Sequence, residues 1–114
     1  MDIDHLRTLC LNLPAATEDV KWSNDLVFSI GEKMFCVASL ESPFQCSFKV
    51  PDEEFEELII KPGFLPAPYM ARAKWVMVTQ TAKLNGRQWE DYIKRSYELV
   101  KSKLTMKMKN KLGI

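Results

Sequence analysis

The side chains with the clearest chemical role in this sequence are cations, and they are concentrated in its second half. Residues 61–114 hold twelve lysines and arginines against three acids, whereas residues 1–60 hold four bases against twelve acids. Basic side chains bind phosphates, so this imbalance predicts a nucleic-acid partner. The candidate DNA-binding residues are Arg72, Lys74, Lys83, Arg87, Lys101 and Lys103. The alternative is structural: the halves attract each other within a monomer or across a weak homodimer.

No pattern of catalytic or metal-binding residues stands out. The single histidine, His5, has no cysteine or histidine at zinc-ligand spacing, and nothing nearby suggests that it activates a nucleophile. The carboxylates of residues 52–57 lack the glycine turn of a calcium-binding loop. The four glycines build neither a P-loop nor a dinucleotide fingerprint. We therefore expect a non-enzymatic protein without a metal or a cofactor.

The three cysteines and the N-terminal residues bear on the cellular compartment. Cys36 and Cys46 flank a predicted turn, and hairpin symmetry about Glu41 places them nearly opposite each other, which makes a disulfide conceivable. Free, buried thiols are the expectation in the cytosol. No apolar stretch approaches the ~20 residues that span a bilayer. The acidic start lacks the features of a signal peptide, so we expect a cytoplasmic protein without a membrane partner.

Helices must position these side chains, and their apolar stripes are visible in the sequence. Residues 2–12 carry one stripe and begin with acids that suit a helix N-terminus. A second, shorter helix starts after Pro51 and ends at Lys61-Pro62-Gly63. The last helix has the clearest stripe, which consists of Trp89, Tyr92, Ile93, Ser96, Tyr97, Val100 and Leu104. The lysine-rich segment from about residue 105 is expected to be a flexible basic tail.

Strands separate the first two of these helices. Residues 26–30, 33–40 and 44–50 form a predicted antiparallel meander, in which the third segment alternates apolar and polar residues and the second is apolar on both faces. Residues 75–79 add a strand. The prediction is one α+β domain over residues 1–114, with an antiparallel sheet packed by N-terminal, middle and C-terminal helices. Its order is α-β-β-β-α-β-α, with one further short strand near residues 20–22.

The segment from Lys61 to Val76 is unusual because it combines three prolines with large apolar residues. Proline excludes a helix interior or a central strand. We interpret the segment as a rigid crossover that docks onto the core. The alternative is a site for a protein or a small ligand on the concave sheet face under residues 61–69, with the candidate residues Lys33, Lys49, Tyr69 and Trp75.

Taken in order, several short patterns resemble those of the MmcQ/YjbR family of small bacterial proteins. The resemblance covers nearly the whole chain and rests on Leu13-Pro14, Glu18, Trp22, Lys33, Phe35, Lys49, Gly63-Phe64, Pro66-Ala67-Pro68-Tyr69, Trp75-Val76, Ser96-Tyr97, Val100 and Leu104. The sequence departs from the family before Trp75, where the histidine that members often carry is absent.

This resemblance implies a fold similar to the CyaY-like or secretion-chaperone class, which is α+β with an antiparallel sheet. It implies no established enzyme activity. A DNA-binding role through winged β-hairpins has been suggested for such proteins. This suggestion and the positive charge of residues 61–114 both lead to the hypothesis of a nucleic-acid partner.

Overall fold

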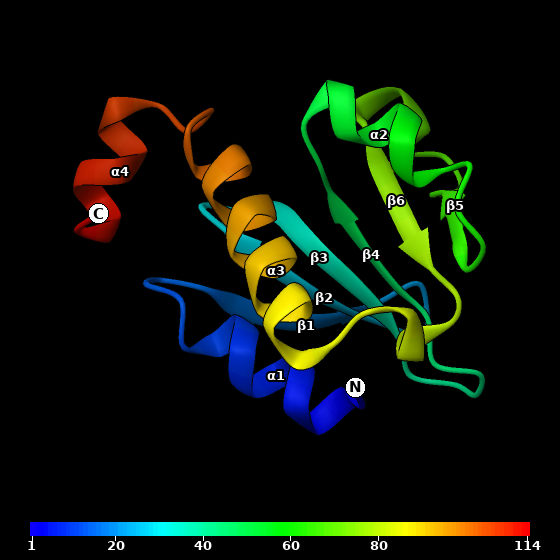
Figure 1. Ribbon diagram of the computed structural model, residues 1–114. Helices are drawn as coiled ribbons and strands as arrows, with labels where there is room; N and C mark the ends of the chain where they lie inside the picture. Colours follow the sequence, from blue (N-terminus) through cyan, green and yellow to red (C-terminus); the bar gives the residue numbers. More distant parts are fainter.

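A six-stranded antiparallel sheet is the frame of the protein, whose computed structural model describes residues 1–114 (Figure 1). The strand order is β1-β2-β3-β4-β6-β5. A meander forms the first four strands, which are β1 (Thr17–Lys21), β2 (Asp25–Ile30), β3 (Lys33–Ser39) and β4 (Cys46–Lys49). The chain then passes through α2 (Asp52–Leu58) to the edge strand β5 (Phe64–Pro66). It returns as β6 (Trp75–Val78), which lies between β4 and β5.

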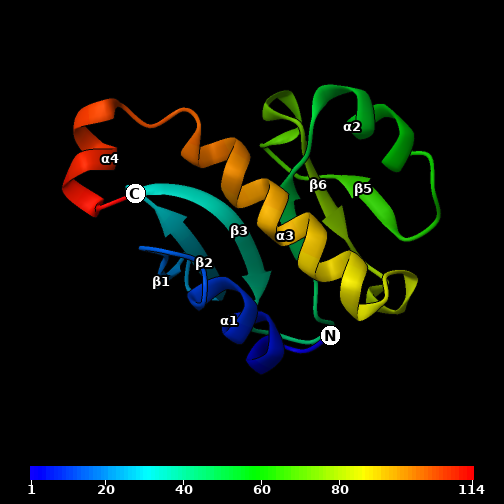
Figure 2. The same ribbon diagram turned by 60° about the vertical axis from the view of Figure 1, so that its left-hand side comes forward.

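Two helices cover one face of the sheet, as Figures 1 and 2 show: α1 (Ile3–Leu11) and α3 (Gly86–Lys101). The predicted stripe of α3 is buried against the strands at Trp89, Ile93, Ser96, Tyr97 and Val100. Asn85 starts this helix, because its side chain and that of Gln88 each accept the other residue's backbone N–H. The predicted α+β class, with helices packed on an antiparallel sheet, is confirmed.

The structure contains two strands and one helix beyond the predicted order α-β-β-β-α-β-α. β1 is a mostly exposed edge strand without apolar alternation, and only its end was anticipated as an extended piece. β5 has three residues and includes Pro66, which an edge strand tolerates. The segment predicted as a flexible tail from about residue 105 instead forms α4 (Met106–Leu112).

Helix α4 is held by its caps and by apolar contacts. Thr105 caps its N-terminus by accepting the N–H of Met108, and Gly113 ends it at a φ of 74°. The side chains of Met108 and Leu112 pack against the main core. The lysines of the segment obscure this pattern, because they are interspersed with the partly buried Met108 and Leu112. No helix of the protein is long and apolar enough to cross a membrane.

A β-bulge in β3 decides which side chains face the helices. The register between β2 and β3 shifts at this point and leaves Phe35 as the additional residue. Phe35 and Cys36 are consecutive, yet both are buried in the core beneath the helices. Strict alternation would place them on opposite faces. The bulge therefore puts Met34 and Val37 together on the open face of the sheet.

The hydroxyl of Ser96 ties α3 to this bulge and to the neighbouring strand. Ser96 is fully buried. Its Oγ donates to the carbonyl of Phe35 at 2.5 Å and accepts the backbone N–H of Lys49 at 2.9 Å. One side chain thus satisfies a backbone acceptor on β3 and a donor on β4, groups that are costly to leave unpaired in a core.

The three cysteines are buried and free. The Sγ atoms of Cys36 and Cys46 lie 3.5 Å apart, without a covalent bond. Cys46 pairs in register with Ala38, so the two thiols are diagonal neighbours instead of the opposed pair that symmetry about Glu41 predicts. Burial, together with the neighbouring thiols, raises the pKa of Cys36 well above its ordinary value. A raised pKa keeps a thiol protonated and unreactive.

Candidate functional site

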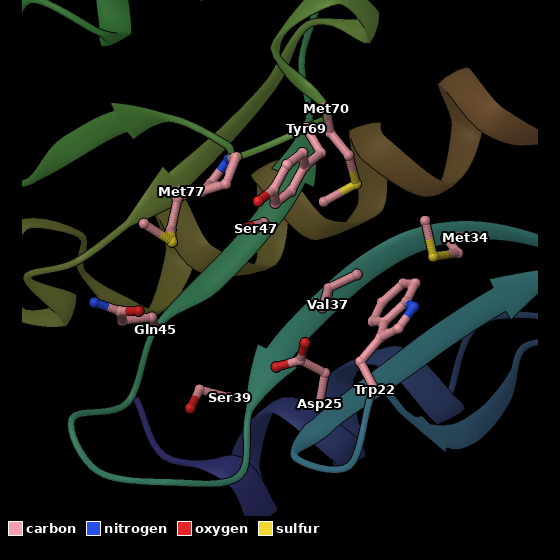
Figure 3. Close-up of a pocket in the computed structure, with 11 residues that line it drawn as sticks. Trp22, Asp25, Met34, Val37, Ser39, Gln45, Ser47, Tyr69, Met70 and Met77 are labelled. Carbon is pink, nitrogen blue, oxygen red and sulfur yellow. The ribbon is translucent and has the colours of Figure 1, made fainter.

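A groove of about 630 Å³ lies on the open face of the sheet, opposite α1 and α3 (Figure 3). Four strands and three connecting segments contribute its lining, which consists of Trp22, Asp25, Met34, Val37, Ser39, Gln45, Ser47, Pro68, Tyr69, Met70 and Met77. Volumes of about 300–1,000 Å³ are typical of sites for small molecules. The groove is therefore large enough for a ligand of about ten to twenty heavy atoms.

The floor of the groove is a row of three residues on adjacent strands. Val37 on β3 pairs with Ser47 on β4, and Ser47 pairs with Met77 on β6. Side chains in register across neighbouring strands point to the same face and stand about 5 Å apart. Ser47 is the smallest of the three, so the floor is hollow at its centre. This difference in side-chain size creates the depth of the groove.

A second row gives one end of the groove a polar character. Asp25 on β2 pairs with Ser39 on β3, and the backbone N–H of Ser39 donates to the carbonyl of Gln45 at 2.9 Å. These three residues all line the groove. The floor thus changes from apolar to polar along the strands, and a ligand with an apolar body and a polar group would match it.

Two aromatic side chains flank the groove from opposite sides. Trp22 follows β1 in the turn to β2, and Tyr69 belongs to the segment between β5 and β6. Trp22 is 63% exposed and Tyr69 is fully exposed. Figure 3 shows the Trp22 ring beside Met34 and Val37, and the Tyr69 ring beside Met70 and Met77. Neither ring is covered by the protein itself, so both are available to a bound molecule.

Both flanking aromatics have strained backbones. The φ angle is 52° at Trp22 and 65° at Tyr69. Left-handed conformations favour glycine and cost a residue with a Cβ about 1–2 kcal/mol. An exposed ring contributes little to the stability of the fold, so it does not offset the cost of this backbone conformation. This kind of strain is concentrated at binding and catalytic sites.

The lining of the groove carries a single formal charge. Asp25 is the only ionisable acid or base among the lining residues apart from the Tyr69 phenol. Its carboxylate makes no hydrogen bond or ion pair within the protein, whose two ion pairs are Arg7–Glu18 at 2.6 Å and Arg95–Glu54. Carboxylates are ionised at neutral pH, so one end of the groove is negative.

The four residues predicted for a ligand site on this face are only partly brought together. Tyr69 lines the groove, and Trp75 lies on the same face but is buried under the connecting segment against Ala67. Lys49 is directed away, because its Nζ donates to the carbonyl of Ala73, and burial lowers its pKa. Lys33 is exposed at the start of β3, outside the groove.

The remaining lining residues were not anticipated from the sequence. The one available signal was the segment of residues 33–40, which is apolar on both faces and therefore predicts cover or a binding surface on each. Met34, the methionine of this segment, lies on the same face as Met70 and Met77 only because of the bulge in β3 and the path of the segment between β5 and β6. Trp22 and Asp25 come from the turn between β1 and β2, whose position over the floor depends on the whole sheet.

The six bases predicted to bind nucleic acid lie in four parts of the fold. Arg72 and Lys83 are exposed on separate short turns of 3₁₀ helix, and Lys74 lies over the ring of Phe55 at 5.1 Å. Arg87 is in the first turn of α3, whereas Lys101 is the last residue of that helix. At 1.5 Å per residue, the two ends of α3 are roughly 20 Å apart.

Part of the charge imbalance is resolved within the fold. Arg95 on α3 forms an ion pair with Glu54 on α2, which joins a base of the second half to the acidic cluster of residues 52–57. Arg7 and Glu18 form the other ion pair, between α1 and β1. Since exposed pairs of this kind contribute about 0.2–1 kcal/mol, they add little to the stability of the fold.

The fold and the groove together define a small α+β domain with a ligand-sized hollow on the uncovered face of its sheet. The family model YjbR matches residues 11–99, and the chain belongs to the YjbR family. The resemblance seen in the sequence is thus confirmed.

Two solved structures are similar in fold to this chain. A Deinococcus radiodurans protein described by the domain DUF419 is 27% identical, with a TM-score of 0.87, and the match covers 98% of this chain and 88% of that one. A Pseudomonas syringae protein is 19% identical, with a TM-score of 0.73 over 88% of this chain and 99% of that one. The second likeness concerns the fold alone. No curated protein matches the sequence.

Proposed function

We propose that this protein is a non-enzymatic binding module, and that the groove on the open sheet face holds a small, mainly apolar ligand. The observation that carries the proposal is the hollow at Ser47, between Val37 and Met77, flanked by the exposed rings of Trp22 and Tyr69. Three methionines line it, and their flexible, polarisable side chains adapt to differently shaped apolar molecules.

The expected affinity follows from the surface that such a ligand removes from water. A naphthalene-sized molecule that buries roughly 200 Å² of apolar surface gains about 5 kcal/mol at about 25 cal/mol per Å². The loss of translational and rotational freedom offsets part of this gain. We therefore expect dissociation constants of about 0.2 mM or weaker for simple aromatic probes.

The hydroxyl groups in the groove are better suited to binding than to nucleophilic attack. Ser39 is the register partner of Asp25, but its Oγ donates to the carbonyl of Glu41 at 2.8 Å. Its proton is therefore not directed at the carboxylate that would have to accept it. Activation of a serine requires a hydrogen-bonded base. This arrangement supports binding without a chemical step.

Filling the hollow at Ser47 is expected to abolish ligand binding. In the Ser47→Phe variant the new ring occupies the centre of the groove, which is open on one side and so accepts it without compressing the core. The measurement is a titration with the neutral fluorescent probe N-phenylnaphthylamine, with a fall in affinity of about 10-fold or more expected. Ser102→Phe, which adds the same ring at an exposed position after α3, is the matched control.

The titration has two outcomes that would sink the proposal. One is that the unmodified protein does not bind the probe. The other is that Ser47→Phe and Ser102→Phe bind it equally well, because the probe would then occupy another surface. Circular dichroism of both variants shows whether the fold is retained.

A second candidate function is binding to the phosphates of nucleic acid, and the positive charge of the C-terminal residues favours it. Residues 99–114 contain five lysines and no acid. Burial, and then the nearby ammonium of Lys103, lower the pKa of Lys49, which indicates that positive charges are close together there. Such a surface would bind DNA without reading its sequence.

Salt dependence tests the nucleic-acid candidate. If about four phosphates are contacted, the affinity for a labelled DNA duplex falls about 100-fold between 50 mM and 200 mM salt. Lys101→Gln/Lys103→Gln should weaken binding and reduce this slope, whereas Lys21→Gln/Lys33→Gln, two exposed lysines of the first half, should not. Fluorescence anisotropy measures both effects. Absence of binding at 50 mM salt would rule the candidate out.

A further inference from the structure

We propose that the groove selects ligands that carry a positive charge, so that its natural occupant is a small organic amine with an apolar body. This inference rests on the proposed function, because it specifies the chemistry of the molecule that the groove holds. Its basis is the position of Asp25 at the polar end of the floor, beside an aromatic ring.

The carboxylate of Asp25 is charged, partly buried and unpaired. No lysine, arginine or histidine is among the lining residues. Lys21 is the cross-strand partner of Asp25 but is exposed and forms no ion pair with it. A carboxylate in a groove of low polarity is stabilised by a cation that enters beside it, whereas an anion is repelled. The charge of the groove is therefore complementary to a cation.

The flanking aromatics favour the same ligand. The Asp25 carboxylate lies between Trp22 and Ser39 in Figure 3. The face of an aromatic ring attracts cations, and tryptophan does so most strongly. An ammonium group at this end would contact the carboxylate and the Trp22 ring together.

The rest of the groove fits the apolar body of the amine. From the polar row, the floor continues to the apolar row of Val37 and Met77 on neighbouring strands. A flat ring that rests on this row lies beneath Tyr69, whose side chain is fully exposed in the free protein. The cation determines the orientation of the ligand, and the apolar body contributes most of the buried area.

Three probes with one ring system and different charges test the inference. They are naphthylmethylamine, which is a cation at neutral pH, naphthylmethanol, which is neutral, and naphthoate, which is an anion. Isothermal titration calorimetry gives the three affinities. We expect the cation to bind about 10-fold more tightly than the neutral probe, and the anion to bind most weakly.

Substitutions of Asp25 test whether its carboxylate causes the preference for the cationic probe. Asp25→Asn should bring the affinity for the cation within about 2-fold of the affinity for the neutral probe. Asp25→Lys should favour naphthoate. Asp19→Asn, which removes a charge from the adjacent strand β1 outside the groove, is the matched control and should keep the preference of the unmodified protein.

The outcomes separate this inference from the proposed function. Equal binding of all three probes to the unmodified protein would overturn the selection of cations and leave a ligand groove without charge preference. A preference that survives Asp25→Asn would also overturn it. Binding of none of the probes, including the neutral one, would count against the groove as a ligand site and hence against both.

Discussion

Replacing Phe35 by alanine is expected to lower the free energy of unfolding by about 3–5 kcal/mol, the cost typical of removing a buried aromatic side chain. Phe35 is fully buried at the bulge of β3. Its ring meets that of Tyr97 edge to face, with the centroids 5.4 Å apart, and lies 6.4 Å from that of Phe28. The substitution removes these contacts and leaves a cavity between the sheet and α3.

Urea unfolding followed by circular dichroism measures this loss. Tyr69→Ala is the matched control, because it removes a similar ring that is fully exposed; we expect it to change the free energy of unfolding by less than about 0.5 kcal/mol. A loss of under about 1 kcal/mol for Phe35→Ala would contradict the packing described for the bulge.

The double variant Trp22→Gly/Tyr69→Gly is expected to lose ligand affinity without losing stability. Each ring that contacts a ligand contributes about 1.4 kcal/mol or more, so removing both should weaken binding by about 100-fold. Glycine relieves the strain of the left-handed backbone at both positions, which offsets the lost contacts of Trp22. The free energy of unfolding should therefore stay within about 1 kcal/mol of the original value.

A titration with N-phenylnaphthylamine and a urea unfolding curve test the two halves of this prediction. Ile60→Gly removes an exposed apolar side chain outside the groove and serves as the control for binding. Unchanged affinity in the double variant would show that the rings do not contact the ligand. A large loss of stability would show that they are structural.

The fold was largely predictable because its main elements carry local signals. The stripe of α3 follows from side-chain spacing alone, and the alternation around Phe48 indicates a strand. Its predicted wet face is wrong, because Ser47 is buried at the bottom of the groove. β5 and α4 were not predicted. The first is a three-residue edge strand with a proline, and the second is stabilised by a cap at Thr105 and by contacts with distant parts of the core.

The groove was much less predictable, because its geometry depends on long-range register. Alternation along β3 places Met34 and Val37 on opposite faces, and only the bulge at Phe35 reverses this. Tyr69 was identified because an aromatic residue in a proline-rich segment is conspicuous. Asp25 gives no local signal, since a single acid at the start of a strand is common on protein surfaces.

The methyl groups of the methionines provide the most direct test of the central claim that the groove binds a small apolar ligand. Three of the six methionines, Met34, Met70 and Met77, line the groove, whereas Met1, Met106 and Met108 lie elsewhere. With methyl-labelled protein and N-phenylnaphthylamine, we predict that the NMR signals of the first three shift on titration and that those of the others do not. Shifts confined to Met106 and Met108, or no shifts at all, would contradict the account.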